Sequence, residues 1–384
     1  MSDDRYTEVT RESWFGRIGG ALKGILAGLI LFVLSFALLF WNEGRAVKRH
    51  KTLKEGGGAV VSITCDSVDE ANNGQLVHVT GRADTDARLT DPVFGVSVDA
   101  LKLKRIVEMY QWKETSERKT QKKIGGGSET VTTYSYTKAW SIAPIRSSDF
   151  RKPEGHGNPG TMPYESLEQS AQKVTLGAYV LSPSLVGMIQ NFQPLPVDID
   201  TRFPQELQGK LKTHDAGFYI GGDSASPQVG DMRIFFEVAR PTEVSIIAKQ
   251  VEATFEPYLT KAGGTIELLE TGVHSADAMI QKAQESNTIL TWMIRLAGFI
   301  LMFLGLTLIL KPLSVMADLL PILGDIVGAG AGFISFLLAL MLSLITIGIA
   351  WMVYRPLLGI VLLAGAVALT PAIRGKLKTA RIAG

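Results

Sequence analysis

The side chains that could carry chemistry in this chain are few and scattered. A metal site needs three or four ligands at workable spacing, and the five histidines show no such spacing: His50, His78, His156, His214 and His274. Cys65 is the single cysteine, so an intrachain disulfide and multi-cysteine metal sites are excluded. No serine lies in a nucleophile-elbow pattern. The sequence therefore predicts no enzyme, no catalytic residue, no metal site and no cofactor.

Three glycine runs raise the possibility of a phosphate-binding loop. They lie at residues 56–58, 125–127 and 221–222, and none has the lysine and the strand-to-helix setting of such a loop. We interpret them as hairpin tips. Cys65, in the strand-like run "AVVSITC", is interpreted as a small buried hydrophobe.

Composition and charge point to a membrane protein. The chain has 39 basic and 37 acidic residues, a balance that gives no basic field for nucleic acid. Its 46% hydrophobic content averages a polar middle with very apolar ends. We therefore expect an α+β multi-pass membrane protein in which transmembrane helices flank a large β-rich domain.

Four apolar segments are long enough to cross a bilayer, which needs about 20 residues. They are residues 18–41, 288–310, 326–353 and 357–373. The run 326–373 would measure about 72 Å as one helix, so a tight turn is expected at 354–356, where Arg355 and Pro356 interrupt it.

Charge bias sets the expected orientation. The N-terminal tail (1–17) carries Arg5, Arg11 and Arg17, and the C-terminal tail (374–384) carries four Lys or Arg residues. Counting Lys and Arg places both tails in the cytoplasm, together with an interfacial loop at 311–325. The block 42–287 would then be extracytoplasmic. The bases that follow Trp41 oppose this bias, and we attribute them to the negative end of the helix dipole, with Gly44 as the helix cap.

The pattern of the polar block, residues 42–287, predicts mainly β-strands. Alternating apolar residues predict a hairpin over "GDMRIFFEVAR" and "EVSIIAKQV", and a longer hairpin whose tip holds residues 125–127. A short helix capped by Ser182 is expected, and one continuous helix from Ala276 to Leu310. The basic tip, with Arg118, Lys119, Lys122 and Lys123, could touch anionic lipid or a partner, but a solvated hairpin end is favoured.

Two glycine ladders recur at four-residue spacing, the pattern that lets membrane helices approach closely. They are Gly20, Gly24 and Gly28, and Gly324, Gly328 and Gly332. Glycine is also simply frequent in membrane helices, and the ladders could join helices within one chain or between chains. Both alternatives remain open at this point.

Several residues are expected at the membrane interface: Trp14, Trp41, Arg45 and Arg355. Arg295 lies near the start of its span, and we expect its long side chain to reach the interface. Asp318 and Asp325 are candidates for functional intramembrane acids. We favour the other interpretation, in which the loop that carries them lies along the cytoplasmic interface and both carboxylates are in water.

The chain resembles the family of transmembrane protein 43, also called LUMA. The resemblance depends on "FWNEGRAV", "LGAYVLSPSL", "FQPLP", "GDMRIFFEVARPTEVSIIAKQ" and "TFEPYLTKAGGTIELLETG", which occur in this order over most of the chain. It implies four spans, a lumenal domain, cytosolic or nucleoplasmic termini and no established catalytic residues. Animal members are associated with the endoplasmic reticulum and inner nuclear membrane, with lamins and emerin as partners.

Those partners are not carried over, because the single cysteine and undecorated tails fit a bacterial member in the inner (cytoplasmic) membrane. The leading hypothesis is a non-enzymatic membrane scaffold that self-associates and organises membrane protein complexes or membrane structure. Its partners would be the lipid bilayer, further copies of the chain and unidentified membrane proteins, with no nucleic acid. The alternative is an oligomeric ion channel, a pore or a channel modulator, which the weakly polar third span mildly disfavours.

Overall fold

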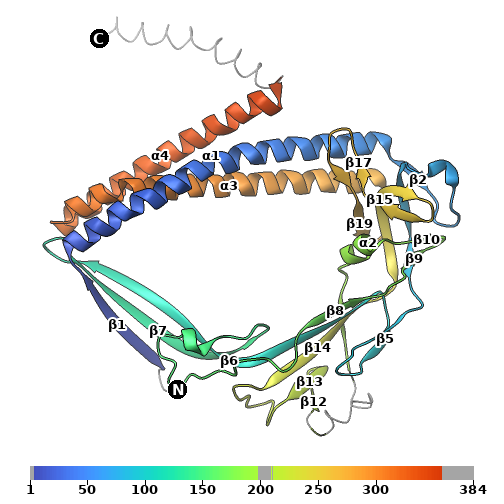
Figure 1. The fold of residues 1–384 in the computed structure, drawn as a ribbon, viewed down its shortest axis with the longest axis horizontal. Helices are drawn as coiled ribbons and strands as arrows, with labels where there is room; N and C mark the ends of the chain where they lie inside the picture. The colour runs from blue at the N-terminus through green and yellow to red at the C-terminus, as the bar shows by residue number, and fades with distance from the viewer. Residues whose placement is uncertain (1–3, 198–208, 210, 357–384) are drawn as a thin grey trace, which may run out of the picture. The chain divides into compact units, whose positions relative to one another are not determined.

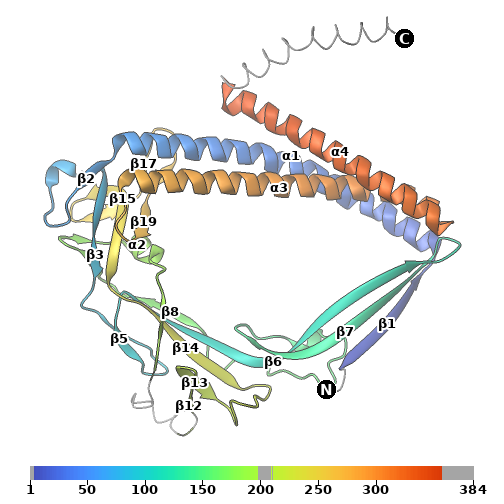
Figure 2. The same ribbon diagram turned by 180° about the vertical axis from the view of Figure 1, so that it is seen from behind.

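The computed structural model describes residues 4–197, 209 and 211–356. It divides the chain into two compact units. The β-rich unit comprises Met1–Val9, Glu55–Lys119 and Val131–Gln281, and the helical unit comprises Thr10–Lys54, Thr120–Thr130 and Lys282–Gly384. Figure 1 labels the elements, and Figure 2 gives the opposite view.

Three helices are long and apolar enough to cross a membrane: α1 (Trp14–Ala59), α3 (Ala276–Ala317) and α4 (Pro321–Tyr354). Both views show α1 and α3 side by side (Figures 1 and 2). The expected fourth span, 357–373, lies outside the described residues. The remaining helices are short: α2 (Pro183–Met188) and two 3-10 turns, η1 (Glu70–Asn72) and η2 (Ser147–Asp149).

The long helices extend beyond the segments expected from the sequence. α1 continues through Gly44 and through residues 56–58, so Gly44 is not a cap and that glycine run is not a hairpin tip. α3 continues past Pro312, as apolar helices tolerate when neighbours support the freed backbone. Only three residues, 318–320, separate α3 from α4, in place of the expected loop at 311–325.

Two sheets make up most of the β-rich unit, and the first continues into the helical unit through a long hairpin. The first sheet runs in the order β1 (Arg5–Glu12), β7 (Ser128–Ser141), β6 (Lys102–Lys122), β14 (Met232–Ala239), β13 (Gly217–Ile220) and β12 (Leu211–His214), with β11 (Gln193–Leu195) on β14 and β8 (Leu167–Ser170) on β6. The second runs in the order β19 (Leu268–Thr271), β15 (Thr242–Val251), β16 (Thr254–Glu256), β10 (Tyr179–Val180), β9 (Thr175–Leu176), β3 (Leu76–Asp84) and β2 (Val61–Ile63). Two small ribbons pair β17 (Tyr258–Leu259) with β18 (Thr265–Ile266) and β4 (Arg88–Thr90) with β5 (Ser97–Asp99).

One expected hairpin is confirmed and the other is wrong. β6 and β7 are neighbours, with residues 125–127 at their tip. β14 and β15 follow each other in the chain, but β14 pairs with β6 and β13, whereas β15 pairs with β3 and β19. β15 is buried on both faces along residues 244–248, as expected for a central strand. Its pattern alone could not reveal its neighbours.

Each sheet has its own apolar core. The first packs Phe94, Phe218 and Phe236 together, and the second packs Tyr179 and Phe255, whose rings stack 5.1 Å apart. Cys65 is partly buried against the second core.

Candidate functional site: two charged clusters in the helical unit

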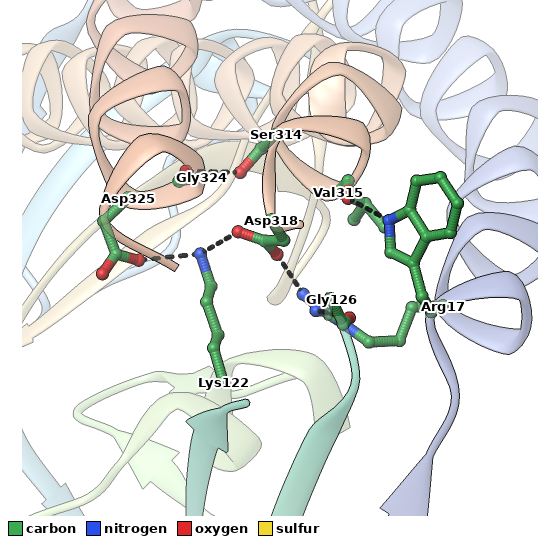
Figure 3. Close-up of polar contacts among 9 residues, drawn as sticks. Arg17, Lys122, Gly126, Ser314, Val315, Asp318, Gly324 and Asp325 are labelled. Atoms are coloured by element: carbon green, nitrogen blue, oxygen red, sulfur yellow. Dashed lines mark hydrogen bonds and ion pairs between the residues drawn. The ribbon is translucent and has the colours of Figure 1, made fainter. Parts of the chain in front are cut away.

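The turn between α3 and α4 brings together one group of charges, which we call the turn cluster: Arg17, Lys122, Asp318 and Asp325 (Figure 3). Ser314 Oγ donates a hydrogen bond to the Gly324 carbonyl at 3.0 Å and closes the turn. A Cβ on Gly324 would collide with the Asp318 side chain, so the turn requires glycine there.

Asp318 is the centre of the turn cluster. Its side chain is 1% exposed, and it pairs with Arg17 from α1 through one oxygen and with Lys122 Nζ at 2.7 Å through the other. Lys122 also reaches Asp325 at 2.7 Å, and Arg17 donates to the Gly126 carbonyl. A buried carboxylate needs such partners, because an unpaired charge away from water is costly.

The same turn holds the beginning of α1. Trp14 Nε1 donates a hydrogen bond to the Val315 carbonyl at 2.9 Å. Gly126, which has a φ of +83°, lies against the Trp14 ring so closely that a Cβ would collide with it. The tip of the β6–β7 hairpin, the start of α1 and the α3–α4 turn therefore form one packed site (Figure 3).

The electrostatics of Lys122 follow from these contacts. Burial works to lower the pKa of Lys122, but the hydrogen bonds and charges of Asp318 and Asp325 outweigh it and raise the pKa above its usual value. Lys122 therefore stays charged in this site.

A second group, the exit cluster, joins all three long helices. The buried Glu43 carboxylate of α1 accepts hydrogen bonds from Arg295 Nε at 2.7 Å and Nη2 at 2.9 Å, on α3. It also accepts one from Trp351 Nε1 at 2.8 Å, on α4. The bidentate geometry makes this a strong pair. The Arg295 side chain is held by Glu43 and is 13% exposed. Its expected reach to the membrane interface stays a prediction.

Polar contacts extend the exit cluster along α1 and α3. Asn42 Nδ2 donates to the Thr291 carbonyl at 3.0 Å, and Arg45 donates to Asn287 Oδ1 and Thr291 Oγ1, each at 3.0 Å. Arg45 Nε is buried and has no hydrogen-bond partner in the described part of the chain. The Arg45 side chain thus lies between α1 and α3, and its expected place at the membrane interface stays a prediction.

The two clusters are separated by a membrane-sized interval. Arg17 and Glu43 are 26 positions apart on α1, which corresponds to about 39 Å of α-helix. The hydrocarbon core of a bilayer is about 30 Å thick, and about 40–45 Å with its headgroup regions. The charges therefore lie at the two ends of an apolar segment.

The glycine ladders contribute unequally to packing inside one chain. A Cβ on Gly28 would lie 2.7 Å from the Gly305 carbonyl oxygen, so α1 and α3 approach closely there. A Cβ on Gly328 would lie 2.8 Å from Ser314 Oγ, and one on Gly20 would lie 3.8 Å from Glu12. Gly24 and Gly332 have no atom of the described chain within 4 Å of such a Cβ. Gly305 was missed because it belongs to no ladder.

The remaining expected site residues are placed as follows. Trp41 is 56% exposed, and the Arg355 N–H donates to the Trp351 carbonyl at 2.7 Å just after α4. The expectation that both carboxylates are in water is wrong for Asp318 and holds for Asp325, whose side chain is 70% exposed. The hairpin tip is not simply solvated, because Lys122 binds both acids. In the described part of the chain no three His, Cys, Asp or Glu residues gather to hold a metal ion.

The contacts also limit the membrane topology. The expected topology assigns Lys122 to the outside and Arg17 and Asp318 to the cytoplasm, yet these three are joined by ion pairs. It also assigns the N-terminal tail to the cytoplasm, yet β1 pairs with β7. Residues in direct contact lie on one face of a bilayer, so these contacts and the expected topology exclude each other.

Three long apolar helices with charge clusters at the ends of an apolar interval, together with two β-sheets, define an α+β integral membrane protein. The model of one family, described as transmembrane protein 43, matches residues 109–356. The chain belongs to the transmembrane protein 43 family.

Curated relatives agree with this assignment. Transmembrane protein 43 of Rattus norvegicus is 36% identical over 96% of this chain and 93% of its own length. The Homo sapiens protein is 36% identical over 92% of this chain and 90% of its own length. The Drosophila melanogaster homolog is 32% identical over 89% and 92%. No solved structure matches the chain. The bacterial origin expected from the tails stays a prediction.

Proposed function

We propose that the protein is a non-enzymatic membrane scaffold, which self-associates through its helices and organises membrane protein complexes or membrane structure. The supporting observation is the uncovered apolar surface of the helical unit. Only 17%, 22% and 28% of the most apolar segments of α1, α3 and α4 are buried within the described chain. In a membrane, this surface is available to lipid and to other helices, including those of a second copy.

The open glycines mark where such helices would pack. Gly28 already contacts α3 within the chain, whereas Gly24 and Gly332 leave open space above their backbones. A neighbouring helix can approach a glycine backbone closely, and van der Waals packing is the main attraction between helices in lipid. The proposal assigns Gly24 and Gly332 to contacts between chains.

Leucine substitution tests this assignment. Gly24→Leu and Gly332→Leu should lower the oligomeric mass of the full-length protein in native mass measurement, while the protein still inserts and folds. Gly348→Leu is the matched control. Gly348 also has open space, and it lies 16 positions from Gly332 on α4, about 160° around the helix axis. An unchanged oligomer in both test variants would contradict the proposal.

The alternative, an ion channel or pore, finds little support in the side chains of α4. Its polar residues Ser335, Ser343 and Thr346 are buried within the described chain, and Thr346 Oγ1 donates to the Leu342 carbonyl at 2.7 Å. They line no hydrophilic path in a single copy. Purified protein in liposomes should give no ion flux above empty vesicles, and robust flux would favour the channel instead.

The cellular location is part of the proposal. We place the protein in the cytoplasmic membrane if its source is bacterial. The resemblance implies that the β-rich unit is extracytoplasmic, and the ion pair between Lys122 and Asp318 opposes the cytoplasmic α3–α4 turn that this orientation was expected to have. Protease added to right-side-out vesicles should then cleave the β-rich unit. Protection of that unit would contradict the orientation.

A further inference from the structure

An open apolar groove runs between α1 and α4 at the end where both helices leave their apolar segments. It has a volume of about 650 Å³ and is lined mainly by Phe36, Phe40, Trp41, Ile345 and Ile349. Trp41, Ile345 and Ile349 are 56%, 48% and 47% exposed, so nothing in the described chain covers the groove.

A basic hollow continues the groove. It has a volume of about 600 Å³, and its lining includes His50, Lys51 and Lys54 of α1 and Arg355 after α4. Among the described residues, no acidic side chain lines the hollow, and no carboxylate pairs with any of these four side chains. The hollow therefore carries an uncompensated positive charge.

Tyr354 joins the two hollows, because it lines both of them. Its ring lies 5.3 Å from the Phe40 ring, centroid to centroid. The hydroxyl end of the ring also lies close to Gly44, where a Cβ would be 2.7 Å from Tyr354 Cζ. This approach explains a glycine in the middle of α1. The apolar groove and the basic hollow thus meet at a fixed aromatic ring.

We propose that this continuous surface binds a phospholipid with an anionic headgroup, with an acyl chain in the groove and the phosphate against Lys51, Lys54 and Arg355. The groove belongs to the apolar segments, where acyl chains are the solvent, and each buried methylene contributes about 0.8 kcal/mol. The bases lie beyond those segments on the polar side: Arg355 directly follows α4, and Lys51 and Lys54 are 10 and 13 positions past Trp41 on α1. Basic residues in such a position attract anionic lipids.

The charge pattern favours an anionic lipid over the other occupants. An apolar helix of this chain or of a second copy could cover the groove, but it offers no negative charge to the basic hollow. A zwitterionic lipid could fill the groove, but its headgroup carries no net charge.

Native mass measurement of the full-length protein in detergent tests the proposal. The protein is titrated with phosphatidylglycerol or with phosphatidylcholine of the same acyl chains. The variant K51Q/K54Q removes two exposed charges, and Lys48→Gln is its matched control, because Lys48 is exposed on the same helix but does not line the hollow. A second variant, Ala37→Phe, fills the groove, since Ala37 is one of its lining residues.

The proposal predicts that the native protein binds phosphatidylglycerol more tightly than phosphatidylcholine. The double variant should lose about thirtyfold in affinity for phosphatidylglycerol alone, since each of the two bases near a membrane surface contributes about 1 kcal/mol. Lys48→Gln should bind like the native protein, and Ala37→Phe should weaken both lipids. Equal binding of phosphatidylglycerol by the native protein and the double variant would overturn the proposal. So would unchanged lipid binding in Ala37→Phe, the result expected if a helix already covers the groove.

Discussion

The buried carboxylate of Asp318 makes the sharpest prediction about this protein. Asp318→Asn keeps the shape of the side chain but removes the charge that Arg17 and Lys122 share. Breaking one side of a buried ion pair typically costs about 3–5 kcal/mol. Lys122 keeps Asp325 as a partner and its side chain is 27% exposed, so we expect the lower end, about 3 kcal/mol.

Asp325→Asn is the matched control for this change. Asp325 binds the same lysine nitrogen at the same distance, 2.7 Å, but its side chain is 70% exposed. An exposed pair contributes about 0–1 kcal/mol. The assay is denaturant unfolding of the full-length protein in detergent micelles. Equal and small losses in the two variants would refute the burial of Asp318.

A double-mutant cycle between Asp318→Asn and Lys122→Gln tests the contact itself. Residues in one ion-pair network show coupling energies of about 0.5–3 kcal/mol. A coupling within this range would place the hairpin tip and the α3–α4 turn on one face of the membrane. A coupling near zero would remove that contact and leave the topology expected from the sequence standing.

The pH profile gives a second readout of the same site. Because the pKa of Lys122 is raised in the folded protein, its stabilising contribution is fully present below the unfolded value of about 10.4. It is lost as the pH rises through the raised folded value. The stability difference between the native protein and Lys122→Gln should therefore stay constant from neutral pH to about pH 10 and shrink above it. A difference that shrinks already below pH 9 would contradict the two-carboxylate environment.

Four further substitutions have defined outcomes. Gly28→Ala should destabilise the protein by about 1–3 kcal/mol, because its Cβ would lie 2.7 Å from a carbonyl oxygen of α3, whereas Gly24→Ala should leave the unfolding midpoint unchanged. Glu43→Gln should cost about 3–5 kcal/mol by leaving Arg295 buried without a charge partner, and an unchanged midpoint would show that Arg295 reaches water. Tyr136→Phe should cost about 1–2 kcal/mol through lost hydrogen bonds. It should also remove an ultraviolet titration near pH 12, since burial and Glu114 raise the pKa of Tyr136 to about 12; a titration near pH 10 would contradict this environment.

The helices and the long hairpin could be predicted because their signals are local. Apolar runs of sufficient length locate α1, α3 and α4, and the Ser182 side chain caps α2 as expected, accepting a hydrogen bond from the Leu185 N–H at 3.3 Å. The C-terminal end of α1 could not be predicted from the sequence, because a glycine such as Gly44 often ends a helix. In the structure Gly44 lies inside α1, where the absence of a side chain lets Tyr354 approach.

Strand partners were harder, because pairing depends on residues far apart in the chain. The alternation in β14 correctly identified its buried face, with Met232 and Ile234 inside. The turn after β14 suggested a hairpin with β15, but Arg240 and Pro241 lead the chain into the other sheet instead. Local pattern fixes which face of a strand is buried, and not which strand lies beside it.

The sequence by itself determined that this chain enters a membrane, where its apolar segments lie, and which family it belongs to. Length and hydropathy are enough to identify the membrane segments, because a helix that crosses a bilayer needs about 20 apolar residues in a row. The ordered motifs are enough to identify the family. Only the tertiary structure decided that Glu43 meets Arg295, that Asp318 is buried between Arg17 and Lys122, and that Gly28 faces Gly305. Those pairs are separated by hundreds of residues in the chain, and their energies depend on burial and distance, which exist only once the helices have packed.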